Sequence, residues 1–124
     1  MVRTLSLLFA VLAIGCSSTT DPASEILSAH AEDRALTLTN MSDEPVYFFA
    51  ADKNSLALLD WAVCTDPARC TAVPPHSTKI VSYSQIAAYQ EGSDLAVVYH
   101  WRIVDKGSGH YDYDRLRELE VKLH

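Results

Sequence analysis

The sequence predicts an all-β fold, a small antiparallel β-sandwich, with a small β-barrel as the alternative architecture. Two observations predict it. Short segments in which apolar and polar residues alternate recur along the chain, and turn-forming residues separate them at the spacing of hairpins. In addition, the chain shows no sustained apolar period of about 3.6 residues, which is the pattern of a core-facing helix.

The first strand that this alternation predicts covers residues 35–40, with two leucines on its buried face. Before it, residues 24–31 favour a short turn or an edge segment. The stretch 40–45 contains turn residues and ends in a proline, which is tolerated at the first position of a strand. Residues 46–51 are apolar on both faces, and we therefore expect a central strand that is covered on both sides.

The stretch 55–64 is ambiguous. A period of two places Trp61 and Val63 on one face, whereas a helical interpretation begins at a cap on Asn54. We predict a strand for its second half, because that half leads directly into the cysteine-bounded loop. The two prolines at 74–75 exclude a central strand from the connector that follows.

In the last third of the chain, residues 79–83 predict a short strand and residues 84–89 a single helical turn. The strongest strand pattern covers residues 94–104, and we assign its odd-numbered residues to the core and its even-numbered residues to a mixed face. The glycine-rich stretch 105–109 predicts a hairpin loop. Strict alternation of apolar and charged residues over 118–123 predicts a surface strand.

The beginning of the chain differs from this pattern. A single charge, Arg3, precedes the apolar run 5–14, which spans about 15 Å as a helix, half of a hydrocarbon core of about 30 Å. The run therefore fits the apolar region of a secretory signal peptide better than a membrane-spanning helix. It ends in the tetrapeptide 13–16, Ala-Ile-Gly-Cys, which resembles the lipobox of bacterial lipoproteins.

The resemblance implies that residues 1–15 are a signal peptide that is removed, and that Cys16 carries the covalent lipid that holds the chain on the membrane. Residues 16–24 then form the lipidated cysteine and a flexible tether, and residues 25–124 a single β domain. Because Ser17, and not aspartate, follows the cysteine, the family's sorting rule implies the periplasmic face of the outer membrane. The alternative is an ordinary signal peptide with an incidental Cys16.

The net charge of the chain limits the kinds of partner that we expect. The formal net charge is −6, and removal of Arg3 with the leader makes the mature chain more acidic. An acidic chain lacks the positive footprint of a nucleic-acid-binding protein, so we expect no nucleic-acid partner. The acidic residues are scattered, which is typical of a solvated surface. The alternative is that they steer a cationic partner towards the domain.

The two cysteines that remain beyond the leader are Cys64 and Cys70. An even pair in an oxidising compartment predicts a disulfide, and Asp66 and Pro67 between them favour a turn that brings the ends together. The alternative is a metal or redox pair. Such pairs have about two to four residues between the cysteines, and the spacing here fits neither type well.

Two features of the predicted strands are similar to immunoglobulin-like sandwiches. One is the turn at 40–45 leading into the apolar strand that starts at Val46, and the other is Trp61 close to a cysteine. The resemblance is at the level of the fold and implies no activity. The disulfide of immunoglobulin domains joins two sheets, whereas Cys64 and Cys70 lie too close in sequence for that.

We expect no enzymatic activity and no cofactor, because the chain carries no recognisable catalytic motif. Ser108 and His110 lie in a stretch with the composition of a polar hairpin tip. Asp112 and Asp114 would share a strand face, but the surrounding residues lack the pattern of a calcium-binding loop.

Two kinds of binding site remain candidates. A histidine-based metal site would draw on His76, His100 and His110, if the fold brings them together. A protein-binding surface is favoured by tyrosine and arginine, the residues that dominate interface energies. We assign that surface to the following residues: Tyr99, His100, Arg102, Tyr111 and Tyr113.

The sequence thus predicts a lipid-anchored β-sandwich of the cell envelope, a non-enzymatic structural or protein-binding module with an envelope protein as its partner. The first alternative is a periplasmic inhibitor of a cationic hydrolase such as lysozyme, which the acidity and small size favour. The second alternative is a histidine-based metal-binding protein.

Overall fold

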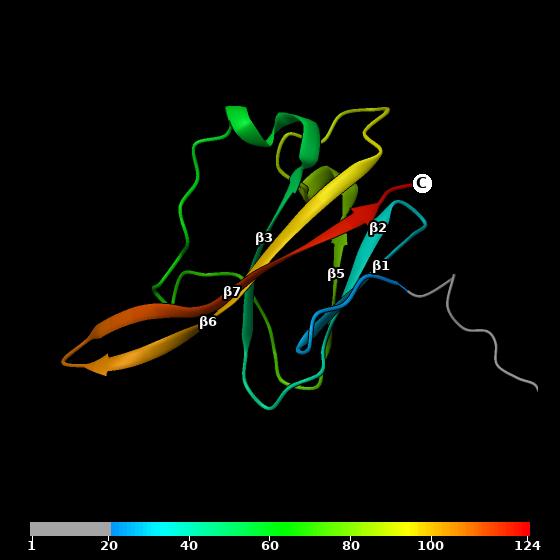
Figure 1. Ribbon diagram of the computed structural model, residues 1–124. Helices are drawn as coiled ribbons and strands as arrows, with labels where there is room; N and C mark the ends of the chain where they lie inside the picture. The colour runs from blue at the N-terminus through cyan, green and yellow to red at the C-terminus, as the bar shows by residue number, and fades with distance from the viewer. Residues whose placement is uncertain (1–20) are drawn as a thin grey trace, which may run out of the picture.

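The computed structural model describes residues 21–124 (Figure 1). The predicted leader, Cys16 and the first part of the predicted tether lie outside these residues. Strands account for most of the described chain. They are β1 (Leu27–Glu32), β2 (Ala35–Asn40), β3 (Val46–Asp52), β4 (Ala72–Val73), β5 (Thr78–Ser82), β6 (Leu95–Gly107) and β7 (His110–Lys122). Two short 3₁₀-helices are η2 (Lys53–Leu58) and η3 (Tyr83–Gln85).

The strands form two antiparallel sheets that pack face to face (Figure 1). One sheet has the order β1-β2-β5 and the other the order β4-β3-β6-β7. The chain crosses from one sheet to the other after β2, β4 and β5, which is the Greek-key connectivity of an immunoglobulin-like sandwich. In the described residues the sheets do not close on each other, so the predicted sandwich is confirmed and the barrel alternative is wrong.

The hydrophobic core lies between the two sheets and follows the alternation of the sequence. In β2, Leu36 and Leu38 are fully buried, whereas the alternating Thr37 and Thr39 are not. In β7, the apolar Leu119 and Val121 are buried between exposed charges. Strand β3 lies between β4 and β6 and has both faces covered, which confirms the prediction of a central strand.

The prediction for the faces of β6 is wrong. The residues that face the other sheet are even-numbered, Ala96, Val98 and His100, and all three are buried. The odd-numbered Tyr99 and Trp101 lie on the outer face of their sheet, where Trp61 covers them. The larger apolar residues therefore mark a second, outer cluster, and the small residues fit the narrow space between the sheets.

Residues 59–71 cross the outer face of the four-stranded sheet, and this segment corrects a second prediction. The strand expected over Trp61 to Cys64 does not form. Instead the indole of Trp61 lies between Phe49 and Tyr99, with ring centroids 4.7 Å and 4.8 Å away. The indole N–H of Trp101 donates to the carbonyl of Cys64 at 2.8 Å. The packing of Trp61 and the hydrogen bond to Cys64 thus hold this segment against the sheet without strand pairing.

The helical alternative describes the beginning of this stretch better. Residues Lys53–Leu58 form η2, and Asp52 is its cap, since its carboxylate accepts from the N–H of Ser55 at 3.1 Å. The cap lies two residues before the predicted Asn54. Asp52 is therefore both the last residue of β3 and the N-cap of η2.

The disulfide prediction is supported by the geometry of the pair. Cys64 and Cys70 have their sulfur atoms at bonding distance, and their Cα atoms are 5.8 Å apart. The turn between them is closed by Asp66, whose carbonyl accepts from the N–H of Cys70 at 3.0 Å.

Removal of this crosslink by a Cys64→Ser, Cys70→Ser double substitution is expected to lower the free energy of unfolding by about 2–2.5 kcal/mol, the entropy of a short closed loop. Urea denaturation of the two proteins under oxidising conditions measures the difference. Adding reductant to the unsubstituted protein should produce a similar loss and should not affect the variant. Equal stability of both proteins would show that the crosslink does not constrain the unfolded chain.

Candidate functional site

The structure does not bring the five predicted surface residues into one patch. Tyr99 is half-buried beneath Trp61 on the outer face. His100 faces the opposite sheet and is fully buried, which is the reverse of its predicted exposure. Tyr111 and Tyr113 alone are well exposed, at 41% and 45%.

These two tyrosines lie on a hairpin that projects from the sandwich (Figure 1). Strand β3 pairs with β6 only as far as Trp101, and beyond that point β6 pairs with β7 alone. We call residues 102–115 the arm. At its tip, Ser108 and Gly109 have φ values of 55° and 75°, as a two-residue type I′ turn requires.

The register of the arm separates its side chains into two faces. Ile103 lies opposite Tyr113, and Asp105 lies opposite Tyr111, so both tyrosines share one face. The other face carries two carboxylates, because Asp114 lies opposite Arg102 and Asp112 lies one pair further along the same face. One side of the arm therefore carries both tyrosines together with Asp105, and the other carries Asp112 and Asp114 together with Arg102.

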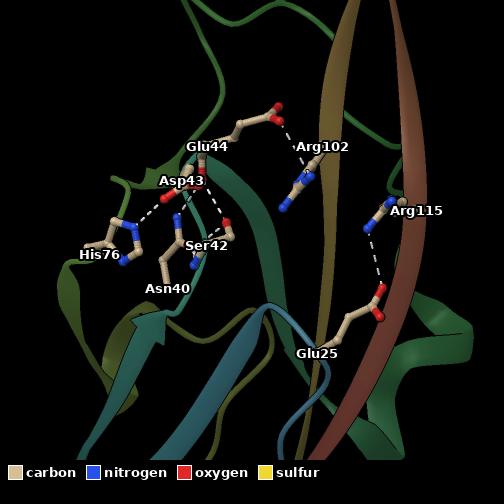
Figure 2. Close-up of polar contacts among 8 residues, drawn as sticks. All are labelled: Glu25, Asn40, Ser42, Asp43, Glu44, His76, Arg102 and Arg115. Carbon is tan, nitrogen blue, oxygen red and sulfur yellow. Dashed lines mark hydrogen bonds and ion pairs between the residues drawn. The ribbon is translucent and has the colours of Figure 1, made fainter.

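The base of the arm is held by two ion pairs from different parts of the chain (Figure 2). Arg102 lies 3.5 Å from Glu44, which belongs to the β2–β3 loop. Arg115 lies 3.4 Å from Glu25, which precedes β1. The side chain of Arg102 is only 17% exposed, so its methylene groups support the arm as well as its charge. The pair of Arg115 with Glu25 is exposed on both sides, and a pair of that kind contributes at most about 1 kcal/mol.

The residue that fixes the β2–β3 loop beside the arm is Asn40, which the sequence placed where a predicted strand ends and a turn begins, with no further role. Its amide group donates to the carbonyls of Glu44 and Val73, at 2.7 Å and 2.9 Å. Its side-chain oxygen accepts from both the backbone N–H and the hydroxyl of Ser42 (Figure 2). The signal available in the sequence was an asparagine two residues before a serine in a turn.

His100 has a different environment from the arm residues. Its Nε2 lies 2.8 Å from the hydroxyl of Ser24, and its buried Nδ1 has no hydrogen-bond partner among residues 21–124. Burial lowers the pKa of the imidazole, and Arg117 lowers it further, while the carbonyl of Val98 acts in the opposite direction. The ring is therefore neutral at pH 7. Ser24, which the sequence assigned to the flexible tether, contacts the folded domain through this bond.

The lowered pKa of His100 predicts an acid-sensitive fold. The unfolded histidine binds a proton near its ordinary value of 6.5 and the folded one does not, so the free energy of unfolding should decrease as the pH falls below 6.5. His30 acts in the opposite sense, because Glu32 and Asp21 raise its pKa. Its contribution is complete below pH 6.5 and is lost as the pH rises through the raised pKa.

Urea denaturation between pH 7.5 and about pH 5 tests this prediction when the protein is compared with a His100→Gln variant. The slope of stability against pH should be smaller in the variant, whatever its absolute stability. A matched His30→Gln variant, which lacks the contribution of opposite sign, should lose stability more steeply as the pH falls. Identical slopes for the unsubstituted protein and the His100 variant would contradict the assignment.

The structure separates the three histidines of the candidate metal site. His76 pairs with Asp43 in the loop beside Asn40, His100 is in the core, and His110 is at the tip of the arm. In the part of the chain that is described, no group of three metal-ligating side chains lies close enough to hold an ion. The histidine-based metal site therefore has no geometric support.

The fold and the arm together define the class of protein, an immunoglobulin-like β-sandwich whose last hairpin is extended beyond the sheet. Comparison with family models, with curated proteins and with solved structures found no match to the chain. Among residues 21–124, no helix is both long and apolar enough to cross a bilayer.

Proposed function

We propose that this chain is a non-enzymatic protein-binding module of the cell envelope and that the arm is its contact surface. The observation that carries the proposal is the exposure of Tyr111 and Tyr113 on a hairpin that projects from the domain. Tyrosine supplies a large contact area with few rotatable bonds, and it is enriched among the residues that dominate interface energies.

The geometry of the arm supports this role. Tyr111 and Tyr113 lie two residues apart on β7 and therefore share one face, so a partner would meet both rings on the same side of the arm. The ion pairs at Arg102 and Arg115 hold the base of the arm against two separate segments. A surface that is ordered before binding loses less conformational entropy on association.

The chemistry of the interior supports a non-enzymatic role. The one hydrogen bond between a serine hydroxyl and a histidine ring in residues 21–124 joins Ser24 to His100, and no carboxylate orients the ring from its other nitrogen. Ser24 also accepts the N–H of Leu27 at 3.1 Å, so it closes a turn. We infer that this pair has a structural function.

The proposed location follows from the leader. Cys16, lipidated on its sulfur and made the first residue by removal of residues 1–15, would hold the domain on the periplasmic face of the outer membrane. Mass spectrometry of the mature protein tests this part of the proposal. We expect Cys16 as the first residue with a lipid mass added, and an intact leader with an unmodified cysteine would overturn it.

The binding role is tested by capture of a partner from an envelope extract. We expect Tyr111→Ala and Tyr113→Ala each to weaken binding about 30-fold, the effect of losing about 2 kcal/mol at an interface hot spot. The matched control is Leu58→Ala, which removes an exposed apolar residue from η2, away from the arm. Equal binding by all three variants would exclude the arm as the contact surface.

The two carboxylates of Asp112 and Asp114 on one face of the arm favour one alternative, an inhibitor of a cationic hydrolase such as lysozyme. In that case Asp112 and Asp114 would make the main contacts, because opposite charges guide association. An Asp112→Asn, Asp114→Asn double variant separates the two proposals. It should abolish inhibition of purified lysozyme if the alternative holds, and it should change partner capture less than the tyrosine variants if the main proposal holds.

A further inference from the structure

Strand β5 forms an edge of the three-stranded sheet, and its outer side is unpaired among the described residues. Its partner on the inner side is β2. The bonds at the two ends of this ladder run from Asn40 N–H to Ser77 and from Tyr83 N–H to Arg34. Hydrogen-bonded pairs alternate in antiparallel strands, so the odd-numbered residues of β5 bond to β2.

The even-numbered residues of β5 therefore direct their backbone groups away from the sheet. Ser82 confirms this direction, because its N–H donates to the side chain of Gln85 at 3.0 Å and not to β2. Thr78 and Ile80 make no backbone hydrogen bond outside the sheet within residues 21–124. The outer edge of β5 thus offers the backbone N–H and C=O groups of Thr78 and Ile80 to an added strand.

A slot of 210 Å³ opens beside this edge, between β5 and β3. Its walls include Phe48, Phe49 and Ala50 from β3 and Val81 from β5. Strand β3, which forms the opposite wall of the slot, has its backbone groups already bonded there. The N–H of Phe48 donates to Thr71, and the carbonyl of Ala50 accepts from Ala87. An added strand would consequently pair with β5, and the side chains on its inner face would enter the slot.

The charged residue that lines the slot is Lys79. It faces inward like Val81, and it forms no ion pair with any other residue that the structure describes. On the outer face of the same strand, Ile80 is 68% exposed. The outer edge of β1 is partly covered by the segment before it, since the N–H of Ala29 donates to Pro22. The edge of β7 is lined with charges of both signs, a pattern that discourages strand pairing.

We propose that the edge of β5 binds an extended segment of a partner protein as an additional strand. The occupant has an apolar side chain that enters the slot opposite Val81 and a carboxylate on the same face opposite Lys79. Backbone bonds to Thr78 and Ile80 supply affinity, and the two inward-facing side chains supply selectivity. This site lies in the sheet that does not carry the arm, so it is independent of the proposed function.

The test uses residues 21–124 in the presence of two synthetic peptides, with backbone amide shifts measured by NMR. In the first peptide every second residue is threonine. Of the residues between the threonines, one is valine and the next is aspartate, so that valine and aspartate share one face of the strand. The second has lysine in place of the aspartate. We expect the first to bind with a dissociation constant of about 1 mM or below, with the largest shifts at Thr78 and Ile80, and the second to bind at least about 5-fold more weakly.

Two substitutions sharpen the test. Ile80→Pro removes only the outward N–H, and proline is tolerated on a sheet edge when its nitrogen faces solvent, so the fold should persist while peptide binding falls at least about 10-fold. Ile80→Val is the matched control and should bind normally. Lys79→Glu, which leaves the backbone unchanged, should reverse the preference between the two peptides.

Three results would overturn the proposal. One is the absence of saturable binding at about 1 mM, and another is binding with shifts located away from β5. The third is a concentration-dependent dimer that Ile80→Pro abolishes, because the edge would then be occupied by a second copy of this chain. Loss of partner capture by the Tyr111→Ala and Tyr113→Ala variants would be no evidence for or against this site.

Discussion

Replacement of Trp101 by alanine is expected to lower the free energy of unfolding by about 3–5 kcal/mol. The side chain is 1% exposed and lies in the outer aromatic cluster, 6.4 Å from Trp61 between ring centroids. The substitution leaves a large cavity, and it also removes the indole N–H that binds the carbonyl of Cys64. The segment 59–71 should detach from the sheet as a result.

Urea denaturation gives the magnitude, and hydrogen exchange gives the location. In the Trp101→Ala protein, amide protons of the segment 59–71 should exchange faster than those of β2. Trp101→Phe is the matched control, since it keeps an aromatic ring and loses the N–H donor; we expect about 1–2 kcal/mol. A loss below about 1 kcal/mol for the alanine variant would mean that the outer cluster does not stabilise the fold.

Replacement of Asn40 by alanine is expected to cost about 2–3 kcal/mol, through hydrogen bonds and not through apolar burial. The asparagine is 1% exposed, and its amide group satisfies the buried carbonyl of Val73. Without it that carbonyl loses this hydrogen bond, and the β2–β3 loop loses the contacts to Ser42 and Glu44. Thermal denaturation measures the loss.

The control for Asn40 is Ser42→Ala, which removes one of the four bonds and should cost less than about 1 kcal/mol. The loop that Asn40 fixes also supplies Glu44 to the base of the arm. Asn40→Ala should therefore weaken partner capture by a few-fold, even though Asn40 lies away from the arm tyrosines. If stability falls and capture stays unchanged, the arm does not depend on this loop for its orientation.

Strand alternation was sufficient to predict much of the fold. The strands β2, β3 and β5 closely match predicted segments, because each one has a period of two or is apolar on both faces. Strand β6 continues into the predicted loop 105–109, and of β7 only the part from residue 118 onwards was predicted, since the first half of β7 is exposed on both faces and has no alternation. The orientation of β6 could not be obtained in this way. Both of its faces are covered, one by the other sheet and one by Trp61, and periodicity does not tell two covered faces apart.

The candidate site was predictable only in part. Tyr111 and Tyr113 were expected at a surface, and the structure exposes them. His100 was expected there too, but the position between the sheets is decided by the register with β3, a long-range property that a local pattern does not contain. The length of the arm has the same origin, since β6 continues for six residues beyond its last pairing with β3 at Trp101.

The segment before β1 has a mechanical consequence. The N–H of Ala29 donates to the carbonyl of Pro22 at 3.1 Å, and Ala23 forms an antiparallel bridge with Ser28, so the chain doubles back on itself as it enters the domain. A load applied between the N-terminal side and a bound arm would open this fold-back first, one bond after another. The extra chain length would be released before the ladder of β1 and β2 began to separate.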